Sequence, residues 1–152
     1  MKNFTLRLII LVTLILTLSS TANAQKIGDI YQGGYLIKLN ANGTGLVACT
    51  KDLWLMNWDD AMDSADSYSS KGFSDWYLPS SRELSIMNST IGFDKPHYNN
   101  KGGFKNNSYY WSSSETGGYL IKTKATTCYM AGGGLSGTDK GEKCRVRLIR
   151  SF

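Results

Sequence analysis

The chain has 152 residues, a formal net charge of +5 and 41% hydrophobic residues. This length suits one domain, and neither an internal repeat nor a low-complexity linker interrupts it. A basic balance favours anionic partners, but nucleic acid is a poor candidate because the chain begins with the pattern of an export signal.

The first 24 residues have the three parts of a cleaved secretory signal peptide. Lys2 and Arg7 give a positive start, residues 8–18 are apolar, and residues 22–24 read Ala-Asn-Ala, a small-x-small cleavage pattern. The apolar run is shorter than the roughly 20 residues of a membrane span, and no Cys follows it to carry a lipid anchor. We therefore expect a single mature domain at residues 25–152, without a transmembrane segment after cleavage, that is secreted, periplasmic or at the cell surface.

Charge is unevenly distributed over the mature domain. Residues 25–75 contain four Lys and seven Asp, whereas residues 76–152 contain eleven Lys or Arg and five acidic residues. Such asymmetry can give a fold one acidic and one basic side, and the basic side would favour anionic ligands. The alternative is an ordinary solvated surface with scattered charge.

A hairpin is predicted near the start of the mature domain. Residues 35–39 form a β-type run, a cluster of Asn, Gly and Thr at 40–45 indicates a turn, and residues 46–49 resume the apolar pattern. Residues 34–49 are therefore expected to form two antiparallel strands.

The first helix is predicted over residues 57–68. Four apolar residues recur there at the spacing of one helix face: Trp58, Ala61, Met62 and Ala65. Several Asp residues lie on the other faces, and early Asp residues suit the positive end of a helix dipole. The spacing of a calcium-binding loop is absent, so we expect no metal site there.

The densest motif is residues 72–84, Gly-Phe-Ser-Asp-Trp-Tyr-Leu-Pro-Ser-Ser-Arg-Glu-Leu. Pro79 pushes the residue before it towards an extended conformation. Ser80 and Glu83 have the spacing of a capping box, in which each side chain bonds the backbone N–H of the other. The motif predicts an ordered, aromatic-anchored loop that leads into a short helix at 81–88.

A long loop rich in Gly, Asn and Lys is predicted over residues 90–108, and long loops on a rigid scaffold often carry function. The only His, His97, lies in it without a nucleophile or carboxylate at a recognisable spacing, so we interpret it as a polar loop residue. In this loop Lys side chains can supply charge, Tyr can stack on a ligand and Asn can form hydrogen bonds. Six residues are therefore candidates for ligand contact: Lys95, Tyr98, Asn99, Lys101, Lys105 and Asn106.

The remaining chain is predicted to be mainly strands. These are a strand at 109–115, a strand or strand pair at 119–130, a Gly-rich connection at 131–141 and a closing strand at 144–150. Basic and apolar residues alternate along the closing strand, so we expect Arg145 and Arg147 to face outward and extend the basic area. They join the candidate ligand-binding residues.

Three Cys, an odd number, allow three disulfide connectivities in an exported chain. Cys128 and Cys144 flank the Gly-rich connection between two predicted strands, so we predict that they form the pair. Cys49 would then be a buried free thiol.

Taken in order, these motifs resemble the Lcl C-terminal domain-like family, long described as a domain of unknown function. The motifs that carry the resemblance are Gly28-Asp29 with Gly33-Gly34, Trp58 with Ala61, residues 72–84, Tyr110-Trp-Ser-Ser-Ser-Glu115, and Arg145-Val-Arg147 followed by Arg150 and Phe152. The chain is similar to the module that ends bacterial collagen-like adhesins, and the similarity covers nearly all of the mature domain.

The resemblance implies an α+β, C-type-lectin-like fold related to that of the formylglycine-generating enzymes. In this fold the N- and C-terminal strands pair in a small antiparallel sheet, two short helices flank it, and long loops form the binding face. We expect Trp76 and Trp111 to share one core beneath those loops. The expected structural motif comprises Asp75, Trp76, Pro79, Ser80, Glu83 and Trp111.

Family members with a known role bind sulfated polysaccharides in adhesion, which implies a non-catalytic binding module for polyanionic glycans. A protein-interaction or structural domain of the cell envelope is the alternative. An enzyme with Cys128 and Cys144 as a reactive pair is the third hypothesis, but no general base accompanies them. The Glu-Pro-Asn and Trp-Asn-Asp triplets of calcium-dependent lectins are absent from the sequence, so we expect neither a metal nor a cofactor.

Overall fold

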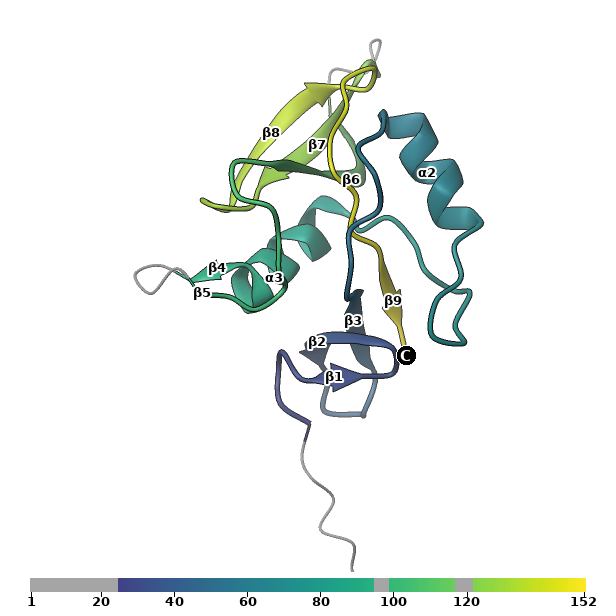
Figure 1. The fold of residues 1–152 in the computed structure, drawn as a ribbon, viewed down its shortest axis with the longest axis vertical. Helices are drawn as coiled ribbons and strands as arrows, with labels where there is room; N and C mark the ends of the chain where they lie inside the picture. The colour runs from purple at the N-terminus through teal and green to yellow at the C-terminus, as the bar shows by residue number, and fades with distance from the viewer. Residues whose placement is uncertain (1–24, 95–98, 117–121) are drawn as a thin grey trace, which may run out of the picture.

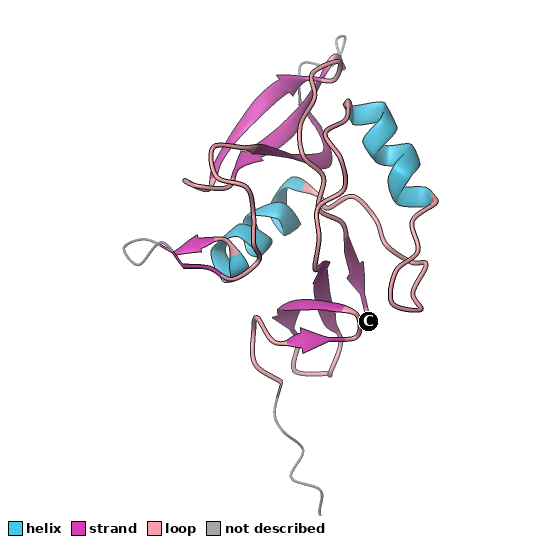
Figure 2. Ribbon diagram, in the orientation of Figure 1, coloured by secondary structure: helices cyan, strands magenta, loops and turns pink. Residues whose placement is uncertain are grey.

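Residues 25–94, 99–116 and 122–152 are described by the structure, a computed structural model (Figures 1 and 2). The predicted signal at residues 1–24 and the loop residues Lys95, His97 and Tyr98 lie outside the described residues. Figure 1 shows two sheets at opposite ends of the molecule, with the helices on either side of the chain between them.

The first sheet joins the start of the domain to its end. It contains β1 (Ile30–Tyr31), β2 (Gly34–Leu39), β3 (Gly45–Cys49) and β9 (Ile149–Ser151), in that order and antiparallel throughout. The predicted hairpin is confirmed as β2 and β3. The C-terminal strand β9 joins the sheet of the N-terminal strands, as the resemblance implied, by pairing with β3, whereas β1 pairs with β2.

The second sheet has three antiparallel strands in the order β6 (Tyr109–Thr116), β7 (Lys124–Tyr129) and β8 (Gly134–Asp139). The prediction of a mere connection at 131–141 was wrong, because β8 pairs along its full length with β7. Strand pairing here overrides a composition rich in Gly and poor in β-branched residues. The predicted long loop contains one further antiparallel pair, β4 (Phe93–Asp94) and β5 (Asn99–Asn100).

The two helices are α2 (Trp58–Asp66) and α3 (Ser81–Ile91). Asn57 caps α2 by accepting a hydrogen bond from the N–H of Asp60 at 2.9 Å. The predicted capping box at Ser80 and Glu83 is present at the start of α3. α2 ends two residues before the predicted boundary and α3 continues three residues beyond it.

Apolar residues form two core clusters. Trp76 and Trp111 are both buried in the first, together with Ala61 and Ala65 of α2, which confirms the expected shared core. The second cluster lies against α3 and the two main sheets and contains Leu84, Met87, Ile91, Tyr110, Met130 and Ile149.

The loop before α3 is held by an ion pair that the sequence did not reveal. The Arg150 guanidinium donates to both carboxylate oxygens of Asp75, at 2.7 and 3.1 Å, and lies 3.9 Å above the ring of Phe73. Hydrogen bonding from Arg150 lowers the pKa of Asp75. Asp75 therefore anchors this loop to β9.

The predicted Cys128–Cys144 disulfide is not formed in the structure, where all three cysteines are free and buried. Tyr110 of β6 pairs with Cys128 on one side and with Arg145 on the other. Cys144 adjoins Arg145, so β6 lies between the backbones of the two cysteines. Two strand spacings of about 4.8 Å each exceed the roughly 7 Å between Cα atoms that a disulfide can span. Cys49 is a buried free thiol, as predicted.

Candidate functional site

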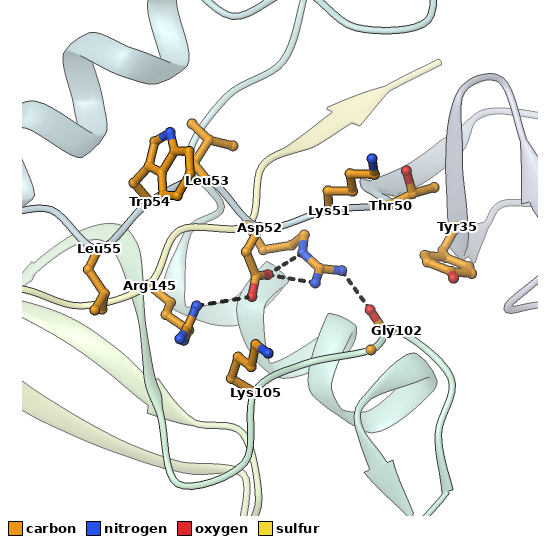
Figure 3. Close-up of a pocket in the computed structure, with 12 residues that line it drawn as sticks. Tyr35, Thr50, Lys51, Asp52, Leu53, Trp54, Leu55, Gly102, Lys105 and Arg145 are labelled. Carbon is orange, nitrogen blue, oxygen red and sulfur yellow. Dashed lines mark hydrogen bonds and ion pairs between the residues drawn. The ribbon is translucent and has the colours of Figure 1, made fainter.

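An open pocket of about 690 Å³ lies where three distant segments meet, at residues 50–55, 102–105 and 145–147 (Figure 3). Four basic side chains line it against a single carboxylate, and we call it the basic pocket. Its lining residues are Tyr35, Thr50, Lys51, Asp52, Leu53, Trp54, Leu55, Gly102, Gly103, Lys105, Arg145 and Arg147.

The floor of the basic pocket is a buried hydrogen-bond network centred on Asp52. Arg147 donates to Asp52 Oδ1 at 2.6 Å, and the Tyr110 hydroxyl donates to Oδ2 at 2.7 Å. Burial, with the hydrogen bond to Asp52, raises the pKa of Tyr110, which keeps its hydroxyl protonated. The same hydroxyl accepts from the backbone N–H of Lys105 at 2.9 Å.

Arg147 is a structural residue, and the prediction that it faces outward was wrong. Its side chain is 2% exposed. Besides Asp52, it donates to the carbonyls of Cys49 at 3.1 Å and Gly102 at 2.9 Å and lies 4.4 Å above the ring of Phe104. The alternating pattern failed here because loop 102–104 covers this segment, so both of its sides are buried. Arg147 holds the segments that form the pocket together, and its N–H groups donate to protein acceptors rather than to solvent.

Three other cations surround this neutralised floor. The side chains of Lys51 and Lys105 are exposed, and that of Arg145 is 24% exposed. Arg145 Nη1 lies 3.9 Å from Asp52 Oδ2, and its Nε donates to Ser108 Oγ at 3.3 Å. Asp52 is already bonded to Arg147 and Tyr110, so the rim carries excess positive charge that is accessible to a ligand.

Apolar groups complete the rim. Trp54 is 86% exposed and Leu55 is 53% exposed, and both are next to the basic residues. Figure 3 shows Trp54, Leu55 and Arg145 on one side of Asp52, with Lys51 and Tyr35 on the other. The arrangement offers ionic contacts together with flat apolar surface, a combination suited to binding.

The structure brings together only some of the predicted ligand-binding residues. Lys105, Arg145 and Arg147 line the basic pocket. Asn99 and Lys101 instead line a second pocket of about 340 Å³ beside the end of α3, where Lys101 Nζ is 3.9 Å from Asp29. Asn106 is exposed in its turn and lines neither of these pockets. The predicted residues Lys95 and Tyr98 lie outside the described residues.

Most of the pocket residues were missed from the sequence, among them Lys51, Asp52 and Trp54. Trp54 lies in the apolar run Leu-Trp-Leu-Met at 53–56, which by itself indicates burial. A continuous apolar run without a clear period is compatible with full burial, so the sequence held no signal that Trp54 faces solvent. The link from Asp52 to Arg147 spans 95 positions and has no local signature.

The fold and pocket define an α+β domain in which the C-terminal strand joins the N-terminal sheet and a basic pocket faces solvent. A sequence model described as the Lcl C-terminal domain matches residues 39–150, and the chain therefore belongs to this family. No curated protein matches the chain in sequence.

Among solved structures, the chain is similar to botrocetin, with 12% identity, a TM-score of 0.45, and coverage of 84% of this chain and 98% of botrocetin. A complex of botrocetin with a mutant A1 domain of von Willebrand factor is similar at 8% identity and a TM-score of 0.42, covering 86% of this chain and 100% of the other.

No helix in the described ranges is both long and apolar enough to cross a membrane. Within those same ranges, no group of three His, Cys, Asp or Glu side chains is placed to hold a metal ion.

Proposed function

We propose that this domain is an exported, non-catalytic binding module that holds a polyanionic glycan, such as a sulfated polysaccharide, in the basic pocket. The observation that carries the proposal is the charge arrangement: Lys51, Lys105 and Arg145 surround a carboxylate that Arg147 already neutralises. Individual exposed charges contribute little, so useful affinity requires several of them to contact one polymer.

The floor supports this proposal because it fixes the rim before a ligand arrives. Arg147 joins the 49–52 segment to loop 102–105, and Tyr110 holds the backbone of Lys105. Rim residues on a fixed backbone lose less freedom on binding, and that lower entropic cost raises affinity.

A binding role is favoured over a catalytic one by the state of the cysteines. Burial raises the thiol pKa of both Cys128 and Cys144 to about 11, so both are protonated near neutral pH. A thiolate is the reactive form, and β6 lies between these two residues. They do not form the adjacent reactive pair that an activity of the formylglycine-generating type would need.

A protein ligand in the cell envelope is the second candidate. The observation in its favour is the exposed Trp54 and Leu55 at the rim, because exposed Trp residues are often anchors of protein interfaces. Export itself rests on residues 1–24, and secretion is checked by N-terminal sequencing of the protein recovered from outside the cytoplasm.

The test compares two variants of equal charge on a heparin column. One is Lys51→Ala/Lys105→Ala/Arg145→Ala, and the matched control removes three exposed lysines outside the pocket: Lys38→Ala/Lys71→Ala/Lys124→Ala. We expect wild type to elute above physiological salt, the control close to it, and the pocket variant at clearly lower salt. Its affinity by calorimetry should fall about tenfold or more.

Two results would contradict the proposal. Wild-type elution at or below physiological salt would favour the protein ligand, and equal losses in both triple variants would mean that net charge alone binds heparin. A glycan and sulfated-polysaccharide array, read with and without calcium, then identifies the ligand.

A further inference from the structure

Trp54 differs from the other three tryptophans of the chain, all of which the structure describes. The indole N–H groups of Trp58, Trp76 and Trp111 donate to backbone carbonyls at 2.8, 3.2 and 2.9 Å. Trp76 and Trp111 are buried and Trp58 is half-buried, whereas Trp54 is 86% exposed. The fold therefore accounts for three of these side chains and leaves Trp54 without a packing role.

The exposure of Trp54 is imposed by a fixed backbone. Leu53 N–H donates to the carbonyl of Val146 at 2.9 Å, and Met56 exchanges two 3.1 Å hydrogen bonds with Cys144. Leu53 and Met56 pack against the first core cluster. With the residues on either side of the Trp54-Leu55 pair held inward, the indole is presented to solvent from a defined position.

The residues around the Trp54 indole indicate which kind of ligand the indole can contact. Trp54 lines the same pocket as Lys51, Lys105 and Arg145 (Figure 3). A molecule bound by those cations in the pocket therefore lies near the indole. A flat aromatic face gives contact energy only to a ligand that also has flat or apolar surface. A sugar ring offers its axial C–H face, whereas a bare chain of phosphates offers none.

Building on the proposed function, we infer that Trp54 is a specificity-determining residue that stacks on a sugar ring of the bound polyanion. The cations supply attraction to any polyanion, and Trp54 adds affinity only when the charges are carried on sugars. The basic pocket thus distinguishes an acidic glycan from a polyanion without rings.

The test measures affinity by calorimetry for two probes of matched charge, a heparin oligosaccharide and a linear inorganic polyphosphate. Trp54→Ala should weaken heparin binding about five- to tenfold and change polyphosphate binding less than about twofold. Trp54→Phe, which keeps a ring, should retain most of the heparin affinity. Leu55→Ala is the neighbouring control, and unchanged thermal unfolding verifies that each variant is folded.

The outcomes separate this inference from the proposed function. Suppose that both probes bind through the three cations and that Trp54→Ala weakens both equally, or neither. This result overturns the role of Trp54 and leaves the polyanion site standing. Failure of wild type to bind either probe overturns the proposed function and the inference with it.

Discussion

Two Arg–Asp pairs of the same chemistry serve different regions of this molecule. In both, a nearly buried guanidinium from the C-terminal segment lies over a Phe ring and binds one Asp: Arg150 with Asp75, and Arg147 with Asp52. The side chains near Asp75 have structural roles, since Trp76 is buried and Ser80 and Glu83 form the capping box of α3.

Around Asp52 the opposite holds. Lys51, Trp54 and Lys105 surround the pair but remain exposed. A buried ion pair therefore does not by itself mark a functional site. We propose that the exposed groups beside the Asp52–Arg147 pair form the binding site, whereas residues 72–84 serve the fold.

The largest effect should follow from Trp76→Ala. The side chain is 3% exposed, and its removal leaves a cavity in the first core cluster, which should lower the free energy of unfolding by about 3–5 kcal/mol. Urea unfolding measures this loss. At a temperature where the variant stays folded, heparin affinity should match wild type, and a variant that kept its stability but lost binding would place Trp76 in the binding site.

Asp52→Ala should affect stability and binding together. It leaves Arg147 buried without its carboxylate, at a cost of about 3 kcal/mol, measured by thermal unfolding. The substitution also makes the pocket more positive, yet heparin affinity should fall because the segments of the rim lose their common anchor. Asp63→Ala, on the exposed face of α2, is the charge-matched control. Stronger heparin binding by Asp52→Ala would show that charge alone governs the pocket.

Asp75→Asn should have the smallest effect, with about 1 kcal/mol lost near neutral pH because the carboxylate is half-exposed and screened by solvent. Hydrogen bonding from Arg150 lowers the pKa of folded Asp75, so this stabilisation is present above about pH 4 and is lost as pH falls through the lowered pKa. Wild-type stability should therefore decline more steeply in acid than that of Asp75→Asn, while heparin binding near neutral pH is unaffected. Parallel acid profiles would mean that the pair contributes nothing.

The sequence predicted those parts of the fold whose causes are local. The capping box at Ser80 and Glu83, the apolar face of α2 and the turn between β2 and β3 each depend on residues a few positions apart. β8 was missed because a Gly-rich strand is stabilised by its partner β7 rather than by its own residues.

Three of the twelve residues that line the basic pocket were predicted, because most of its contacts are not local in the sequence. Lys105 and Arg145 stood out as charge in a loop and on a strand, but the residues opposite them come from residues 50–55, far earlier in the sequence. Trp54 was hidden in an apolar run, and only the backbone bonds on either side of it reveal which residues face solvent. Arg147 was misplaced because period-two alternation assumes one open face.

The contacts of Arg147 with three segments of the chain affect how this domain opens and closes in solution. A single guanidinium joins the carbonyls of Cys49 and Gly102, 98 and 45 positions away. Because these contacts join parts of the chain that are far apart in the sequence, we expect them to open with the domain as a whole rather than locally. A ligand held by the rim should therefore slow amide hydrogen exchange throughout the central core and raise the unfolding temperature of the whole domain, rather than protect the pocket loops alone.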